Sequence, residues 1–277
     1  MSNIAAKAFR RAKLKIQNRL ARINHQPLIF LGKGKSGTTA IAALFAEATG
    51  KSVALDIPAL FIDGIRPILL GRSDLSEVVG RERLAFSHDI IKQPTLTWFF
   101  DELCECFPAA KFVMIVRDPR DNIRSVLNRM AVPGDLNDLS PAMIRNIHGG
   151  WRWHFDEPWL LDLKGANYIE LSANRWNLAT DVYRTHSDRM LLVRYEDFML
   201  DKVGSIGKLA KQLGLLVIKD IAANSERQFQ PQGKDRGKSW SEFFGPRNLA
   251  IIERVCGSRM VEFNYPSSAA AELSSSR

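Results

Sequence analysis

Residues 27–41 read PLIFLGKGKSGTTAI, in which an apolar run meets a glycine-rich turn and then a helical pattern. The pattern predicts a strand over 28–31 and a helix over 39–48. Glycines in such a turn permit positive φ and let a ligand approach the backbone closely. Backbone amides at a strand-to-helix turn, together with the helix N-terminus, attract phosphate. The stretch therefore predicts an α/β fold with a phosphate site at this turn.

The position of the lysine distinguishes this turn from the common nucleoside-triphosphate loop. That loop has glycine, four residues, glycine, and then lysine with serine or threonine. Here Gly32 and Gly37 have the expected separation, but Thr38 follows the second glycine and Lys35 precedes it. A plain glycine-rich turn is the alternative interpretation, and the embedded lysine favours phosphate binding over it.

The rest of the chain alternates between predicted strands and helices. Further strands are expected at 52–55, 90–91, 111–116 and 190–195. Further helices are expected at 96–106, 176–186, 203–213 and 249–263, and another helix follows the 111–116 strand and ends at residue 130. This alternation predicts a three-layer α/β/α fold with a mainly parallel central sheet and a P-loop-like turn. The expected organisation is a basic arm (1–26), one domain (27–266) with a substrate-side insertion at 131–170, and a disordered tail (267–277).

Composition favours a soluble globular protein. Hydrophobic residues make up 45% of the 277 residues and charged residues 25%, which is ordinary for such proteins. No apolar run approaches the roughly 18 residues of a membrane span, and no secretory signal is apparent. Three cysteines without metal-ligand spacing favour a reducing compartment. The expected location is therefore the cytoplasm. The sequence shows no carboxylate-rich cluster, so no metal site is predicted.

Positive charge is concentrated in the first 25 residues. They hold seven of the nine units of net positive charge and no acid, so the charge pattern indicates a basic arm and not a nucleic-acid groove. Phe9, Ala12, Ile16 and Leu20 recur at near-helical spacing, which predicts an amphipathic basic helix. Two interpretations stay open: peripheral contact with an anionic membrane surface or polyanionic partner, or packing of the helix on its own domain.

Two segments resemble a known enzyme family. GKGKSGTT (32–39) followed by VMIVRDPRDNIRSVLNRM (113–130) is similar to the nucleotide signatures of sulfotransferases that use 3'-phosphoadenosine 5'-phosphosulfate (PAPS). Weaker matches follow in IIKQP (90–94), LLVRYEDFMLD (191–201) and KDRGKSW (234–240). The resemblance extends from about residue 28 to 265, and the first two motifs, in this order, are its most specific part.

The resemblance implies a cofactor site without a metal. In that family the lysine-containing loop grips the 5'-phosphosulfate, whereas a strand-end arginine and a serine eight residues later hold the 3'-phosphate. The implied cofactor-binding residues here are Gly34, Lys35, Ser36, Gly37, Thr38, Thr39, Arg117, Ser125, Tyr195, Arg236 and Gly237. Two alternatives remain: Arg117 pairs with a neighbouring aspartate, or Tyr195 is a core residue.

The catalytic residues implied are Lys35, Asp56, Lys92 and His88. Lys35 is expected at the bridging oxygen between phosphate and sulfate, where leaving-group charge accumulates, and Lys92 at the sulfuryl group. Phenol-type members have a histidine base at the position of Pro94, so that base is missing. Carbohydrate and tyrosyl-protein members use a glutamate after the first helix, and Asp56 lies beside that position. His88 is the second candidate base, and a strand-end cap is the other interpretation of Asp56.

The sequence thus predicts an enzyme that moves a sulfuryl group from PAPS to a hydroxyl or amine of a small-molecule or glycan acceptor. Lack of the histidine favours a carbohydrate, as in bacterial synthesis of a surface polysaccharide such as a capsule. Trp151, Trp153 and Trp159 either stack on sugar rings or pack in the core. Two other functions are a small-molecule kinase with an atypical loop and a non-catalytic nucleotide or polyanion binder. The kinase requires lysine after Gly37 and an acid at the strand end, where Thr38 and Arg117 stand.

Overall fold

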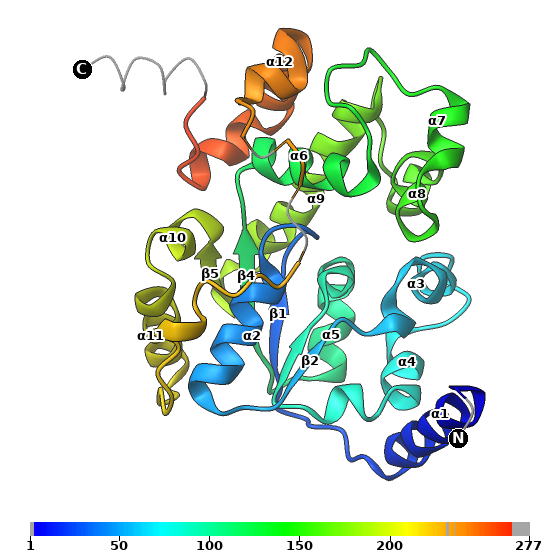
Figure 1. The fold of residues 1–277 in the computed structure, drawn as a ribbon, viewed down its shortest axis with the longest axis vertical. Helices are drawn as coiled ribbons and strands as arrows, with labels where there is room; N and C mark the ends of the chain where they lie inside the picture. The colour runs from blue at the N-terminus through cyan, green and yellow to red at the C-terminus, as the bar shows by residue number, and fades with distance from the viewer. Residues whose placement is uncertain (1–2, 231–232, 236, 268–277) are drawn as a thin grey trace.

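The protein is described by a computed structural model that covers residues 3–230, 233–235 and 237–267. Five parallel strands form one sheet in the order β2-β3-β1-β4-β5 (Figure 1). Their bounds are β1 Leu28–Leu31, β2 Val53–Leu55, β3 Ile90–Lys92, β4 Lys111–Val116 and β5 Met190–Arg194. The predicted α/β class with a parallel central sheet is confirmed.

Helices cover both faces of the sheet. The α-helices are α1 Asn3–Leu20, α2 Thr38–Thr49, α3 Ile62–Leu69, α4 Leu75–Arg81, α5 Phe100–Cys106, α6 Pro119–Met130, α7 Pro141–Asn146, α8 Gly149–Asp156, α9 Tyr168–Thr185, α10 Tyr195–Leu200, α11 Lys202–Leu213 and α12 Trp240–Glu262. Short 3-10 turns are η1 Pro58–Leu60, η2 Ala85–Ser87, η3 Pro94–Phe99, η4 Pro158–Leu161, η5 Ser187–Arg189 and η6 Ala222–Asn224.

The protein has two hydrophobic cores, one on each face of the sheet, and the central strand β1 contributes side chains to both. Its side chains alternate between faces, as in any strand. Phe30 packs with α2 and α11 on one face, whereas Ile29 and Leu31 join the larger core on the other face, to which α5, α6, α9 and α12 contribute. All three side chains are fully buried. A strand buried on both faces reads as a continuous apolar run, which is why LIFL and KFVMIV could be assigned from sequence.

Some element boundaries differ from the predictions because local caps decide them. Helix α9 begins at Tyr168 and not at 176, since the Asn167 side chain accepts hydrogen bonds from the Ile169 and Glu170 amides. Helix α12 begins at Trp240, where Ser239 and Glu242 form a capping box, and it kinks at Gly245. The segment predicted as one helix over 96–106 is η3 followed by α5.

Segments without a clear period also hold structure. Region 57–88 contains α3 and α4, and 131–170 contains α7, α8 and η4. Residues 268–277 of the predicted tail lie outside the described part of the chain. Within the described residues, no helix combines the length and the apolar character that crossing a membrane requires.

Candidate active site

The glycine-rich turn joins β1 to α2 at the carboxyl edge of the sheet. Gly32 and Gly37 have φ of 135° and 85°, as expected, but Gly34 does not have positive φ, and Lys35 does, at 72°. A Cβ atom at Gly37 would lie 2.3 Å from the Tyr195 ring. Only glycine therefore fits between the turn and Tyr195.

A cavity of about 270 Å³ opens beside this turn. The turn and the start of α2 contribute Lys35, Gly37, Thr38 and Thr39 to its wall. Residues that are distant in sequence complete the wall, among them the predicted Arg117, Ser125 and Tyr195. The fold thus gathers most of the predicted cofactor residues around one cavity.

Three predicted cofactor residues lie elsewhere. The hydroxyl of Ser36 accepts a hydrogen bond of 2.9 Å from Asn122 Nδ2, and its amide donates to the Lys33 carbonyl at 3.2 Å. Ser36 is buried behind the turn and its side chain does not line the cavity. Gly34 and the exposed Gly237 do not line the cavity either. The predicted Arg236 lies outside the described residues.

Arg117 occupies the cavity wall at the end of β4. Its Nη1 donates to the Lys35 carbonyl at 3.1 Å, and its guanidinium lies 4.6 Å from the centre of the Tyr195 ring. Its Nη2 is 4.0 Å from Asp121, the limit of an ion pair. Among the described residues its buried Nε has no hydrogen-bond partner. Because the carboxylate contact is long, most of the charge of Arg117 stays available to an anion.

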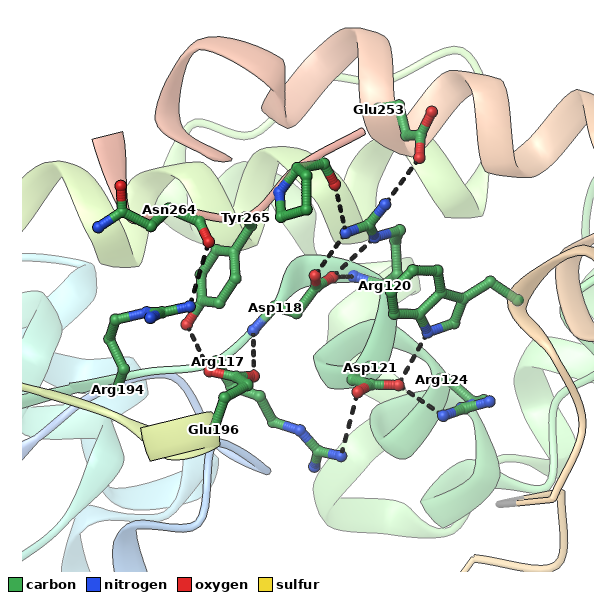
Figure 2. A network of polar contacts seen from close by, with 12 residues as sticks. Arg117, Asp118, Arg120, Asp121, Arg124, Arg194, Glu196, Glu253, Asn264 and Tyr265 are labelled. Carbon is green, nitrogen blue, oxygen red and sulfur yellow. Dashed lines mark hydrogen bonds and ion pairs between the residues drawn. The ribbon is translucent and has the colours of Figure 1, made fainter. Parts of the chain in front are cut away.

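A polar network explains why Arg117 does not pair with Asp118 (Figure 2). The Asp118 carboxylate binds the buried Arg120, with contacts of 2.6 Å and 2.9 Å. Arg120 also binds Glu253 of α12 at 2.8 Å and the Pro266 carbonyl at 2.8 Å. The carboxylate of Glu196 accepts from the Asp118 amide at 3.0 Å. The network ties the ends of β4 and β5 to the C-terminal segment and holds the strand end that carries Arg117.

Lys35 is a partly buried residue of the turn that lines the cavity. Burial is the main cause that lowers the pKa of Lys35, with smaller effects from Arg129, Arg117 and Lys92. Its Nζ donates to Gln230 Oε1 at 2.9 Å, and Gln230 Nε2 donates to Thr39 Oγ1 at 3.3 Å. Gln230 thus links Lys35 to Thr39 across the glycine-rich turn. The sequence analysis did not find Gln230, since it lies in a polar segment without a motif.

The charges on the cavity wall favour an anion. Arg124 is paired with Asp121 at 2.5 Å, and Lys202 with Glu226 at 2.7 Å. In the part of the chain that the structure describes, neither Lys35 nor Arg227, both on the wall, forms an ion pair with a carboxylate. Their uncompensated charge, with Arg117 and the N-terminus of α2, makes the cavity positive.

The candidate base Asp56 follows β2 and lies beside Lys92 at the end of β3. Lys92 Nζ is 2.5 Å from Asp56 Oδ1, and the Asp56 amide donates to the Lys92 carbonyl at 3.0 Å. Burial lowers the pKa of Lys92, and the Asp56 carboxylate opposes this effect. Asp56 directly follows β2, so its interpretation as a strand-end cap stays open beside that of a base, whereas the cap position of η1 is held by Ile57.

His88 is not part of this site. It precedes β3 at the amino edge of the sheet, whereas Lys92 ends the same strand at the carboxyl edge. Its Nδ1 lies 2.9 Å from the Leu84 carbonyl and 3.2 Å from the Ala85 carbonyl. Four residues of extended chain separate it from Lys92, roughly 13 Å. The structure therefore places His88 apart from Asp56 and Lys92.

A second group of basic side chains lies buried behind the turn. Lys33 Nζ donates to Asn122 Oδ1 at 2.6 Å, and burial lowers the pKa of Lys33 to about 7. Burial also lowers the pKa of Arg175 to about 9, and this guanidinium lies 4.2 Å from the Trp153 ring centre. Asn122 also donates to the Gly34 carbonyl at 3.1 Å. These groups shape the turn from behind.

The three tryptophans of the insertion have different environments. Trp153 is a core residue, and a Cβ atom added at Gly34 would be 4.0 Å from the Trp151 ring. Trp159 is 59% exposed. Only Trp159 thus presents a large open aromatic face. Within the described residues, no three His, Cys, Asp or Glu side chains gather in a way that could hold a metal ion.

Comparison with known proteins agrees with this geometry. A family model described as "Sulfotransferase family" matches residues 52–219. The mouse sulfotransferase SULT7A1, solved in complex with PAP, is 16% identical, with 89% of this chain and 88% of that chain covered and a TM-score of 0.51. Sulfotransferase STF9 from Mycobacterium avium is 14% identical, with 87% and 77% covered and a TM-score of 0.52. No curated protein matches the chain significantly in sequence.

The family match spans more than half of the chain. The two structures share the fold at low identity. Together they confirm the resemblance that the turn and the β4 motif indicated.

Proposed function

This chain belongs to the sulfotransferase family, and we propose that it transfers the sulfuryl group of PAPS to a hydroxyl or amine of a carbohydrate acceptor, such as a precursor of a surface polysaccharide. One observation carries the proposal. Lys35 and Arg117 lie on the wall of one positive cavity at the carboxyl edge of the parallel sheet, where ligands of such sheets bind. The PAP bound to the mouse relative supports the nucleotide part of the proposal.

The wall residues fit a nucleotide with two anionic groups. Thr38 and Thr39, at the first turn of α2, would hold the 5'-phosphate with the helix N-terminus. Arg117 and Ser125, on the β4–α6 side, would hold the 3'-phosphate. Tyr195, against which Gly37 packs, would border the nucleotide on the third side. PAPS supplies the activated sulfuryl group when bound.

Lys35 is placed to stabilise charge on the leaving oxygen. Its Nζ is directed into the cavity and meets no carboxylate among the described residues. An ammonium group in a partly buried site stabilises developing negative charge more strongly than one in water. Lys35 would therefore contribute mainly to turnover and less to nucleotide affinity.

Asp56 would accept the proton of the acceptor. Its side chain is 40% exposed, so the oxygen that Lys92 does not bind can reach a hydroxyl. Lys92 holds the carboxylate in place and would contact the sulfuryl group. The exposed ring of Trp159, in the insertion at 131–170, supports a sugar acceptor, since aromatic faces stack on sugar rings. A cytoplasmic site for this reaction belongs to the same proposal.

Transfer of radiolabelled sulfate from PAPS to a panel of glycans and amino sugars tests the proposal. The native chain should label at least one acceptor, whereas Lys35→Ala should lose nearly all turnover and keep measurable PAP affinity by calorimetry. Lys208→Ala, on the exposed face of α11, is the matched control. Labelling of no acceptor, with PAP still bound, would favour a non-catalytic nucleotide binder. A preference for ATP with magnesium over PAP would favour the kinase alternative.

A further inference from the structure

Helix α1 is attached to the domain through one side of its last turn. Asn18 Nδ2 donates to the Arg81 carbonyl at 2.5 Å, and Asn18 Oδ1 accepts from the Leu84 amide at 2.8 Å. Just after the helix, the Ala21 carbonyl accepts from Arg83 Nε at 3.0 Å. The domain therefore faces the side of α1 on which Asn18 lies.

The apolar stripe of α1 lies on the other side. Phe9, Ile16 and Leu20 are 71%, 59% and 77% exposed. At roughly 100° per residue, Ile16 and Leu20 lie within about 20° of Phe9, whereas Asn18 lies about 180° from it. The stripe thus points away from the domain. Figure 1 shows α1 at the margin of the molecule, with the sheet on one side only. The helix thus meets its own domain on the side of Asn18, whereas the stripe does not pack on it.

Basic residues flank the stripe. Lys13 and Arg19 are exposed and lie on its two sides along the helix surface. The helix contains no acidic residue, and its sequence holds four further basic residues, namely Lys7, Arg10, Arg11 and Lys15. A second copy of α1 would bring like charges together, which disfavours pairing of two stripes. An apolar stripe edged by basic groups matches an anionic lipid surface.

We propose that α1 is a docking surface for an anionic lipid bilayer, on which it lies with Phe9, Ile16 and Leu20 turned toward the acyl chains. The chain passes from α1 to the amino end of β1, whereas the cavity lies at the carboxyl ends of the strands. The docked enzyme would thus hold its cavity away from the bilayer, open to nucleotide. The proposal is independent of the acceptor and of the sulfuryl transfer.

Co-sedimentation of the full chain with lipid vesicles tests the proposal. Vesicles that contain about one third phosphatidylglycerol should bind the protein, and pure phosphatidylcholine vesicles should bind it at least about tenfold less. The double variant Ile16→Ser/Leu20→Ser should bind anionic vesicles about tenfold more weakly. Leu14→Ser is the matched control, because Leu14 is an exposed leucine of the same helix that lies outside the stripe. High salt should weaken binding by the native chain.

Equal binding to neutral and anionic vesicles would overturn the proposal, and so would equal binding by the stripe variant and the native chain. Loss of a dimer in the stripe variant, measured by sedimentation velocity, would overturn it as well. Retention of the native chain on polyanionic RNA but not on vesicles would also overturn it. Circular dichroism and the midpoint of thermal unfolding, both expected to match the native chain, show that the variant is folded.

Discussion

Lys92 Nζ lies 2.5 Å from Asp56 Oδ1, and the two side chains differ sharply in exposure. The lysine side chain is 2% exposed, whereas the aspartate side chain is 40% exposed. Strands β2 and β3 pair in register at Leu55 and Lys92, so Asp56 is the first residue beyond the paired strand. Its φ of 61° turns the chain there. The pair thus combines a buried, fixed cation with a carboxylate that keeps one side open.

Asp56→Asn should lower kcat by about 10²- to 10⁴-fold, the usual contribution of a general base. The amide keeps the shape of the carboxylate but takes up no proton at neutral pH. PAP affinity by calorimetry should change by less than about threefold, because Asp56 follows β2 and does not line the cavity at the glycine-rich turn. An unchanged kcat would assign the reaction to another base.

His88→Ala is the matched control for Asp56→Asn. The imidazole lies at the amino edge of the sheet and contacts the Leu84 carbonyl, so its removal should leave kcat and PAP affinity unchanged. The position described here would be contradicted if His88→Ala lost kcat as strongly as Asp56→Asn does while its thermal unfolding midpoint stayed equal to that of the native chain.

Arg117→Lys should weaken PAP binding by about 10- to 100-fold. Lysine retains the charge but loses both the fork of donors and the contact with the Tyr195 ring. Isothermal titration calorimetry at two salt concentrations measures the effect. Arg254→Lys, at the exposed pair with Glu170, is the control and should bind PAP as the native chain does. Equal affinity in Arg117→Lys would mean that only charge matters at this position.

Gln230→Ala should tighten PAP binding by about three- to tenfold. The Gln230 amide occupies the hydrogen-bonding groups of Lys35 and Thr39 that an anion would use, and a net hydrogen bond contributes about 1 kcal/mol. Gln230→Glu should act in the opposite direction, because a carboxylate pairs with Lys35 more strongly. Weaker binding by Gln230→Ala would show that Gln230 contacts the nucleotide itself.

Lys33 should make the free energy of unfolding depend on pH. Its folded pKa is about 7, whereas the ordinary value of 10.5 applies to the unfolded chain. The unfolded chain therefore binds more protons between these values, so the contribution of Lys33 to stability rises from pH 7 toward pH 10. The full penalty of burial is present below pH 7. The rise is on the order of 4 kcal/mol.

Lys33→Met should remove this rise. The difference in unfolding free energy, variant minus native, should fall as pH increases from 7 to 10, measured by denaturant titration at each pH. Loss of the hydrogen bond to Asn122 changes this free-energy difference by the same amount at every pH, so the dependence of the difference on pH is unaffected. Lys208→Met, at an exposed position, should show no such slope. A difference that is flat in pH would mean that Lys33 stays charged when buried.

Arg120→Leu should destabilise the fold by about 3–5 kcal/mol. The change leaves the buried Asp118 carboxylate without the cation that holds it and detaches the Pro266 carbonyl. Chemical denaturation measures the loss. Arg254→Leu removes an exposed ion pair and should cost less than about 1 kcal/mol. Comparable losses in the two variants would mean that the network of Figure 2 adds little beyond surface pairing.

Local pattern in the sequence was enough to predict the parallel sheet and the glycine-rich turn that follows β1. Strands β1 and β4, after the exposed Lys111 at the start of β4, are buried on both faces, so each contains a continuous apolar run that marks the predicted strand. The glycines of the turn mark the change from strand to helix. Lys35 and Arg117 could be named from motifs because each follows directly from such a local signal.

Contacts between distant segments decided the rest. Ser36 turned inward because Asn122, 86 residues away, donates to its hydroxyl, and Gln230 reached Lys35 across 195 residues. The direction of the stripe on α1 depended on where Asn18 meets the domain. A linear pattern records which side chains are apolar or charged and at what period. The packing of helices and loops around the sheet determines which partner a polar side chain meets. That packing depends on many contacts between segments distant in sequence, and no local stretch contains this information.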